Sequence, residues 1–212
     1  MNLYGLAKAF LRPFTTVFFD AKVSGVEHVP INGGLVVASN HLSYWDPPVL
    51  GAWFPRTINY MAKRELFGMW PLGPAIRAVH AFPVDRESSD IGAIRHALRL
   101  LRSGEVVGIF PEGRRNPNGD LQARNGAVLL AATARCPIVP VALVGTNFAS
   151  RRLRGSHVEV RIGEPMQFQG TERKPTKSEI TGWTQQLAAA IADLMERHAD
   201  TKSADSGVLL RR

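Results

Sequence analysis

The stretch from Gly33 to His41, GGLVVASNH, carries the pattern that decides the fold. Two glycines precede the apolar run Leu35 to Ala38, and a short apolar run bounded by turn residues is typical of a buried strand. The run leads directly through Ser39 and Asn40 to the histidine. The sequence therefore predicts that His41 lies at the carboxyl end of a buried strand.

Apolar strands and helical patterns alternate along the rest of the chain. The sequence predicts strands at residues 57–62, 81–84, 106–110 and 138–144, with an edge strand at 158–162. It predicts helices at residues 49–53, 91–102 and 126–134, and from a capping box at Thr176–Glu179 to about His198. This alternation indicates a single α/β domain whose central sheet, mostly parallel or mixed, is flanked by helices.

Residues 67–74, FGMWPLGP, are apolar and broken by glycine and proline. We expect this segment to form a loop or short helix beneath a cover. Residues 200–212 are mostly polar before a final Leu-Leu-Arg-Arg, and we expect them to be disordered.

The N-terminal residues 1–20 have the pattern of an amphipathic helix. At 100° per residue, Lys8, Arg12 and Asp20 fall opposite one broad apolar face. We interpret the segment as an interfacial helix lying on a membrane, with a cover helix on its own domain as the alternative. The predicted organisation is this segment at 1–20, one α/β domain at 21–199 and the tail at 200–212. The apolar face comprises Leu3, Leu6, Ala7, Phe10, Leu11, Phe14, Val17 and Phe18.

The amino-acid composition indicates which class of partner the protein binds and in which compartment it works. The 212-residue chain has a formal net charge of +8, which indicates an anionic partner. The charge is spread along the chain without an interleaved basic and aromatic motif, so a membrane and phosphate-bearing substrates are favoured over nucleic acid. Cys136 is the only cysteine, which excludes an intramolecular disulfide and fits a reducing compartment. We expect a peripheral protein on the cytoplasmic face of a membrane.

The segment Asn40 to Asp46, NHLSYWD, combines a histidine with a carboxylate. Histidine is the side chain best suited to accept a proton near neutral pH, and a carboxylate on its other ring nitrogen fixes the tautomer. A five-residue offset within a turn would let Asp46 reach His41. Taken alone, such a pair is more often a structural hydrogen bond.

Three later segments carry complementary chemistry. Residues 82–86, FPVDR, end in an arginine suited to bind a phosphate through two hydrogen bonds. Residues 110–115, FPEGRR, combine a carboxylate, two cations and a glycine that lets the backbone approach a ligand. Residues 138–142, IVPVA, form a strand in which Pro140 favours an edge or bulge.

Three of these polar groups follow predicted strands. His41, Arg86 and Glu112 each come just after an apolar run. In α/β folds, ligands bind beyond the carboxyl ends of the strands. We therefore predict one site that contains all three.

The order and spacing of the four segments resemble the glycerolipid acyltransferases, the family that includes the bacterial 1-acylglycerol-3-phosphate acyltransferases. That family carries an N-H-x4-D block, a block ending in arginine, an F-P-E-G-x-R block and a V-P-V-like block. The resemblance covers about residues 22–170 and implies acyl transfer from acyl-CoA or acyl-carrier protein to a lysophospholipid, without a metal or cofactor.

The resemblance also implies roles for individual residues. His41 would be the general base and Asp46 its orienting partner, while a thiolate leaving group makes a covalent enzyme intermediate unnecessary. The substrate-binding set implied by the resemblance is Arg86, Glu112, Gly113, Arg115, Asn40, Ser43, Arg124 and Pro140.

Some positions depart from the family pattern. Arg114 and Asn116 flank Arg115 where threonine and serine are common, and His80 replaces a common glycine. Arg124 replaces a common lysine. We place the first two changes near the acceptor, so glycerol-3-phosphate, another lysophospholipid or a glycolipid are alternative acceptors. A thioester hydrolase and a non-catalytic membrane-binding protein are the further alternatives.

Overall fold

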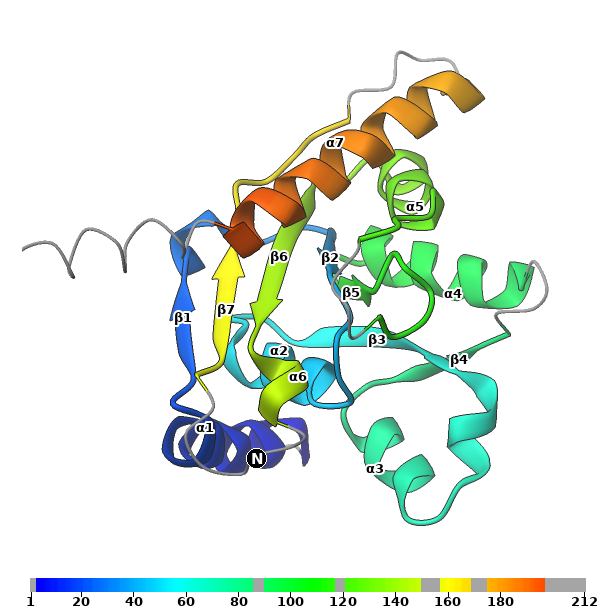
Figure 1. Cartoon of the computed structure of the whole chain (residues 1–212). Helices are drawn as coiled ribbons and strands as arrows, with labels where there is room; N and C mark the ends of the chain where they lie inside the picture. The colour runs from blue at the N-terminus through cyan, green and yellow to red at the C-terminus, as the bar shows by residue number, and fades with distance from the viewer. Residues whose placement is uncertain (1–2, 86–89, 117–120, 150–156, 169–174, 197–212) are drawn as a thin grey trace, which may run out of the picture.

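The structure, a computed structural model, describes residues 3–85, 90–116, 121–149, 157–168 and 175–196. A seven-stranded sheet in the order β1-β7-β6-β2-β5-β3-β4 forms its centre (Figure 1). Neighbouring strands are parallel except β6 and β7, so the predicted mostly parallel sheet is present. The strands are β1 Lys22–Ser24, β2 Leu35–Ser39, β3 Ile58–Lys63, β4 Phe82–Val84, β5 Val106–Ile109, β6 Ile138–Val144 and β7 Glu159–Ile162.

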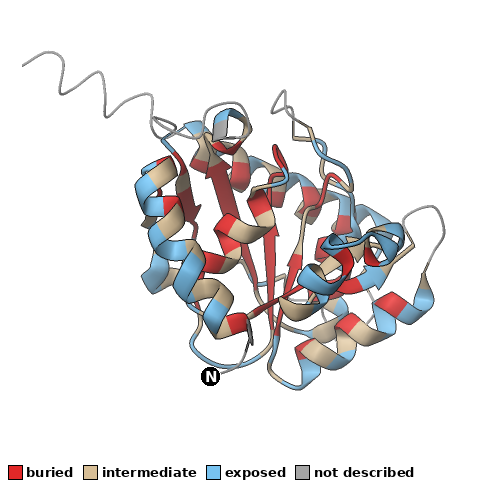
Figure 2. Cartoon of the chain, turned by 90° about the horizontal axis from the view of Figure 1, so that it is seen from below, coloured by how far each residue is buried: buried red, intermediate tan, exposed pale blue. Residues whose placement is uncertain are grey.

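Helices cover both faces of the sheet, because its strands alternate apolar side chains between two cores. Leu35 and Val37 of β2 join the core beneath α1 and α2, whereas Val36 and Ala38 join the core beneath α4, α5 and α7. Figure 2 shows the buried strands between these layers. The longer helices are α1 Leu3–Phe19, α2 Asp46–Trp53, α4 Ile91–Arg102, α5 Gly126–Ala134 and α7 Lys177–Glu196. The shorter ones are η1 Val26–His28, η2 Arg64–Gly68, α3 Leu72–Ala78 and α6 Thr146–Ala149.

Strand β2 lies between β5 and β6 and pairs with both in parallel. All five of its residues are buried, as the continuous apolar run predicts. The segments that follow β2 and β5 therefore emerge side by side at the carboxyl edge of the sheet. This places the residues after Ser39 next to those after Ile109.

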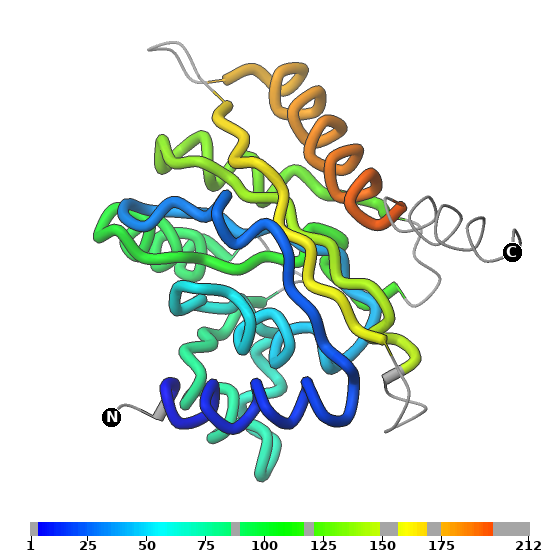
Figure 3. Tube along the Cα trace, turned by 90° about the vertical axis from the view of Figure 1, so that its left-hand side faces the viewer, coloured from blue at the N-terminus to red at the C-terminus, as the bar shows by residue number. Residues whose placement is uncertain are grey.

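The structure corrects the predicted position of β7 and decides between the two positions predicted for Pro140. Strand β7 was expected at an edge but lies between β1 and β6, because the three-residue strand β1, which the sequence analysis did not predict, covers it (Figure 3). Pro140, expected at an edge or a bulge, lies at a bulge of the inner strand β6. Ile138 pairs with Met166 and Val141 with Ile162, so the partner segment holds one extra residue where proline lacks an N–H donor.

The predicted N-terminal helix is present, but its apolar residues divide between two sides. Tyr4 and Phe19 are buried, and Phe14 and Phe18 also pack against the core. The outward side exposes Leu6, Phe10 and Val17. Within the described residues, no helix combines the length and apolar character that a membrane span needs.

The predicted cover over residues 67–74 is wrong for its central part. Met69, Trp70 and Leu72 are exposed in the described structure, and only Phe67 and Gly73 of the segment are buried. Arg86 and the tail at 200–212 lie outside the described residues.

Candidate active site

The main chain of His41 is held from both sides by the segment after β5. Its N–H donates to Glu112 Oε1 at 2.9 Å, and its carbonyl accepts from the Asn116 N–H at 2.7 Å. The parallel pairing of β2 with β5 brings these segments together. The predicted neighbourhood of His41 and Glu112 is therefore present, with the glutamate bound to the backbone of the histidine.

Asp46 collects three hydrogen bonds on a single oxygen. Its Oδ2 accepts from His41 Nδ1 at 2.7 Å, from the Leu42 N–H at 2.6 Å and from the Ser43 N–H at 2.7 Å. The carboxylate is fully buried at the first residue of α2, where the helix dipole favours a negative charge. The predicted hydrogen bond between His41 and Asp46 is present, and it closes the turn that carries the histidine.

This contact defines the chemistry of the imidazole. Because the carboxylate accepts from Nδ1, that nitrogen carries the proton and Nε2 is the basic nitrogen. The ring stacks on Phe110, with centroids 4.2 Å apart, and its side chain is 11% exposed. Nε2 has no hydrogen-bond partner among the described residues, so it is available to a substrate proton.

Glu112 is a buried residue, and this burial raises the pKa of its carboxyl above the ordinary value. The His41 N–H and the Asn116 side chain lower the pKa of Glu112, while the charge of Asp46 raises it further. Asn116, which the sequence analysis noted only as a departure, therefore supports both Glu112 and the His41 backbone.

A pocket of about 520 Å³ opens beside Glu112 and gathers cationic side chains. Gly113 turns the chain there with φ +72°, a conformation that favours glycine, and the Arg124 side chain lies against it. Arg124 N–H donates to the Pro111 carbonyl at 2.9 Å. Guanidinium groups around such a pocket suit a phosphate or carboxylate. Its lining residues are Glu112, Arg114, Arg115, Asn116, Gln122, Ala123 and Arg124.

Arg115 is fixed by Tyr44, which the sequence analysis did not assign to the site. The guanidinium donates to the Tyr44 hydroxyl at 2.6 Å and lies 3.4 Å from the centroid of its ring. Tyr44 belongs to the turn between His41 and Asp46. The NHLSYWD segment thus orients both the imidazole and a cation of the adjoining pocket.

Three residues that were predicted to bind substrate make contacts with other parts of the protein instead. The Asn40 amide exchanges two hydrogen bonds with the main chain of Leu143, at 2.7 and 2.8 Å. Ser43 Oγ accepts from the Trp45 N–H at 3.2 Å, and Pro140 is buried in β6. In these contacts all three shape the surroundings of His41.

His80 was expected near the acceptor but packs against Tyr4 of α1, with ring centroids 5.3 Å apart. Its φ is +62°, a conformation for which glycine is the least strained residue. The replacement of the common glycine by His80 therefore affects the contact with α1.

The chain is similar to known proteins both in sequence and in fold. A profile of the family described as Acyltransferase matches residues 20–144. A 1-acyl-sn-glycerol-3-phosphate acyltransferase of Bacillus subtilis is 35% identical over 193 residues, which cover 91% of this chain and 96% of that protein. The human 1-acyl-sn-glycerol-3-phosphate acyltransferase beta is 38% identical over 119 residues, which cover 54% of this chain and 42% of that protein. The crystal structure of a 1-acyl-sn-glycerophosphate acyltransferase of Thermotoga maritima matches with a TM-score of 0.72 at 25% identity, covering 90% of this chain and 78% of that one.

Proposed function

The chain belongs to the acyltransferase family, and on that premise we propose that it transfers a fatty acyl group from an acyl thioester to the free hydroxyl of 1-acylglycerol-3-phosphate, giving phosphatidic acid. The observation that carries the chemistry is the His41–Asp46 pair with a free Nε2. The names of the matched relatives support the acceptor.

The proposed reaction is a direct transfer. His41 Nε2 takes the proton of the acceptor hydroxyl while that oxygen forms a bond to the thioester carbonyl carbon. The tetrahedral intermediate then expels the thiolate, which accepts the proton from the imidazolium. Asp46 stabilises the imidazolium in between, since its buried carboxylate contacts Nδ1. No metal or cofactor takes part in this scheme.

Arg115 and Arg124 are the proposed ligands of the acceptor phosphate, because both line the pocket beside Glu112. Gly113 keeps the adjoining backbone open to the ligand, and we assign Arg86 to the same role from the sequence alone. Asn40, Ser43, Glu112 and Pro140 act as positioning residues, since their observed contacts are within the fold.

We further propose peripheral attachment to the cytoplasmic side of a membrane, where the lysolipid acceptor resides. The outward side of α1 exposes Phe10 and Val17, while Lys8 and Arg12 donate hydrogen bonds to the carbonyls of Phe54 and Ala52. A helix with an apolar outer side suits a lipid surface, and the net charge of +8 suits an anionic leaflet.

An acceptor and donor panel on the purified protein tests the proposal, with His41→Ala as the control. We expect ester formation on 1-acylglycerol-3-phosphate from acyl-CoA or acyl-carrier protein, and very little with the variant. Acyl-CoA cleavage at an undiminished rate without acceptor would instead identify a hydrolase. A preference for a non-phosphorylated acceptor would contradict the proposal that Arg115 binds the acceptor phosphate.

A further inference from the structure

Residues 66–76, LFGMWPLGPAI, contain no charged side chain, and their only polar side-chain group is the indole N–H. They join η2 to α3 between strands β3 and β4. At the tip, Met69, Trp70 and Leu72 are 53%, 85% and 38% exposed. We call residues 69–72 the apolar turn. A contiguous apolar surface of this kind marks an interaction site, which the proposed chemistry leaves unused.

The base of the apolar turn is fixed by the fold. Phe67 is buried, and the Gly73 N–H donates to the Met69 carbonyl at 2.6 Å. A side chain at Gly73 would meet the Phe67 carbonyl oxygen at 2.3 Å, so only glycine fits this close approach. The exposed side chains therefore project from an anchored support.

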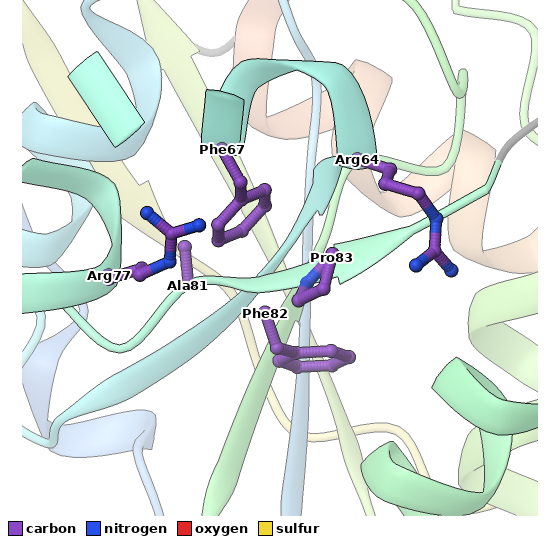
Figure 4. Close-up of a pocket in the computed structure, with 6 residues that line it drawn as sticks. All are labelled: Arg64, Phe67, Arg77, Ala81, Phe82 and Pro83. Atoms are coloured by element: carbon purple, nitrogen blue, oxygen red, sulfur yellow. The ribbon is translucent and has the colours of Figure 1, made fainter. Parts of the chain in front are cut away.

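A cation lies beside Phe67 at the base of the turn. The Arg77 guanidinium is 5.3 Å from the centroid of the Phe67 ring, and no described residue forms an ion pair with it. It lines a pocket of about 440 Å³ with Phe67 and Pro83, and Arg64 stands at the opposite end (Figure 4). Arg64 is already paired with Asp90 at 2.8 Å, so Arg77 is the cation available to a ligand.

The position of the turn indicates its partner. Figures 1 and 3 place α1 and the segment that includes α3 at the same lower end of the molecule. Helix α1, which exposes Leu6, Phe10 and Val17, and the apolar turn thus lie at the same end. Tryptophan prefers the boundary between lipid and water, and a neighbouring arginine complements anionic headgroups.

We propose that the apolar turn is a second membrane-inserting site, in which Trp70, Met69 and Leu72 enter an anionic bilayer and Arg77 binds a lipid phosphate. The proposal rests on the proposed function only in that the acceptor is a membrane lipid. Together with α1, the turn would hold the enzyme on the surface at two separate points, which fixes its orientation.

Vesicle co-sedimentation without substrates tests this directly, using phosphatidylglycerol–phosphatidylcholine vesicles. We expect Trp70→Ala to weaken binding about tenfold, because an inserted indole removes a large apolar area from water. Ile31→Ala is the matched control: Ile31 is also 85% exposed, but lies before β2 at the opposite edge of the sheet, and should bind as wild type. Arg77→Gln should weaken binding about fivefold on anionic vesicles and leave binding to neutral vesicles unchanged.

Trp70→Phe provides a test that does not depend on losing the apolar side chain. Brominated lipids should quench more emission in wild type than in Trp70→Phe, while both proteins bind vesicles alike. Equal quenching, or full binding by Trp70→Ala, would overturn the proposal. A third result would also overturn it: a wild type that is dimeric in solution and a Trp70→Ala variant that is monomeric but still binds vesicles. A second copy of the chain, and not a membrane, would then cover the turn.

Activity distinguishes this proposal from the proposed function. Trp70→Ala should process a short-chain, water-soluble 1-acylglycerol-3-phosphate at the wild-type rate. Suppose that neither wild type nor Trp70→Ala acylates this acceptor, but Trp70→Ala still binds vesicles more weakly than wild type. The membrane site would then stand, and the assignment of the acceptor would fail.

Discussion

Glu112 binds the main chain of His41 and not its ring: Glu112 Oε1 accepts the His41 N–H at 2.9 Å. The two residues are 71 positions apart and meet because β2 and β5 run in parallel. Asp46 meanwhile contacts the ring through Nδ1. One carboxylate therefore places the backbone of the histidine, while the other sets its tautomer.

Glu112→Gln should preserve the site better than Glu112→Ala. The glutamine oxygen can still accept the His41 N–H, so we expect kcat to fall less than about tenfold. Alanine leaves a buried N–H without a partner, at a cost of about 1–3 kcal/mol in the free energy of unfolding. Urea unfolding and kcat of both variants check this, and equal losses in the two would contradict the positioning role.

Glu112 should also make the free energy of unfolding depend on pH. Burial raises the pKa of Glu112 in the folded protein, so the folded state binds the proton more tightly than the unfolded state. The stabilisation is complete below the unfolded pKa of about 4.3 and is lost as pH rises through the raised value. Relative to Glu112→Gln, wild type should lose stability across that window. If wild type instead gained stability relative to Glu112→Gln as pH rises, the folded-state pKa of Glu112 would be lowered, which would contradict this account.

Asp46→Asn should separate the effect of the carboxylate charge from the effect of its hydrogen bonds. The asparagine oxygen can accept the same three N–H donors, but it cannot stabilise an imidazolium by charge. We expect a folded protein whose kcat is lower by about 10²–10⁴-fold. Circular dichroism and steady-state kinetics provide the measurement. Near-normal kcat in a folded variant would show that the carboxylate charge has no role in proton transfer.

Arg115→Ala should raise KM for the phosphorylated acceptor about tenfold or more, as expected for the loss of a charge-assisted hydrogen bond. Tyr44→Phe should act in the same direction more weakly, because it removes the hydroxyl that orients the guanidinium. Arg95→Ala, an exposed arginine of α4, is the matched control. Equal KM values for Arg115→Ala and Arg95→Ala would exclude Arg115 from acceptor binding.

The sequence predicted the elements whose pattern is local. The runs at 35–38 and 138–144 are continuous and apolar because both form inner strands that are buried on both faces of the sheet. Strand β1 was missed, since KVS is too short and polar to show a pattern, and without it β7 was placed at an edge. Local periodicity does not report which strand becomes the neighbour of another.

The site shows the same division between local and long-range information. The five-residue spacing from His41 to Asp46 predicted their hydrogen bond, because both lie in one turn. The pairing of Asn40 with Leu143, and of Tyr44 with Arg115, joins distant segments and left no local signal. Exposure of the apolar turn was equally hidden, because an apolar run fits a covered loop as well as one that faces a lipid.

The most direct test of the central claim is the rate of acyl transfer by His41→Ala. Purified wild type and variant would be compared with labelled 1-acylglycerol-3-phosphate at saturating acyl-CoA, with folding verified by circular dichroism. If His41 is the general base, kcat falls by about 10²–10⁴-fold while KM for the acceptor changes little. A folded variant that keeps kcat within a few-fold of wild type would contradict the assignment of His41 as the proton acceptor.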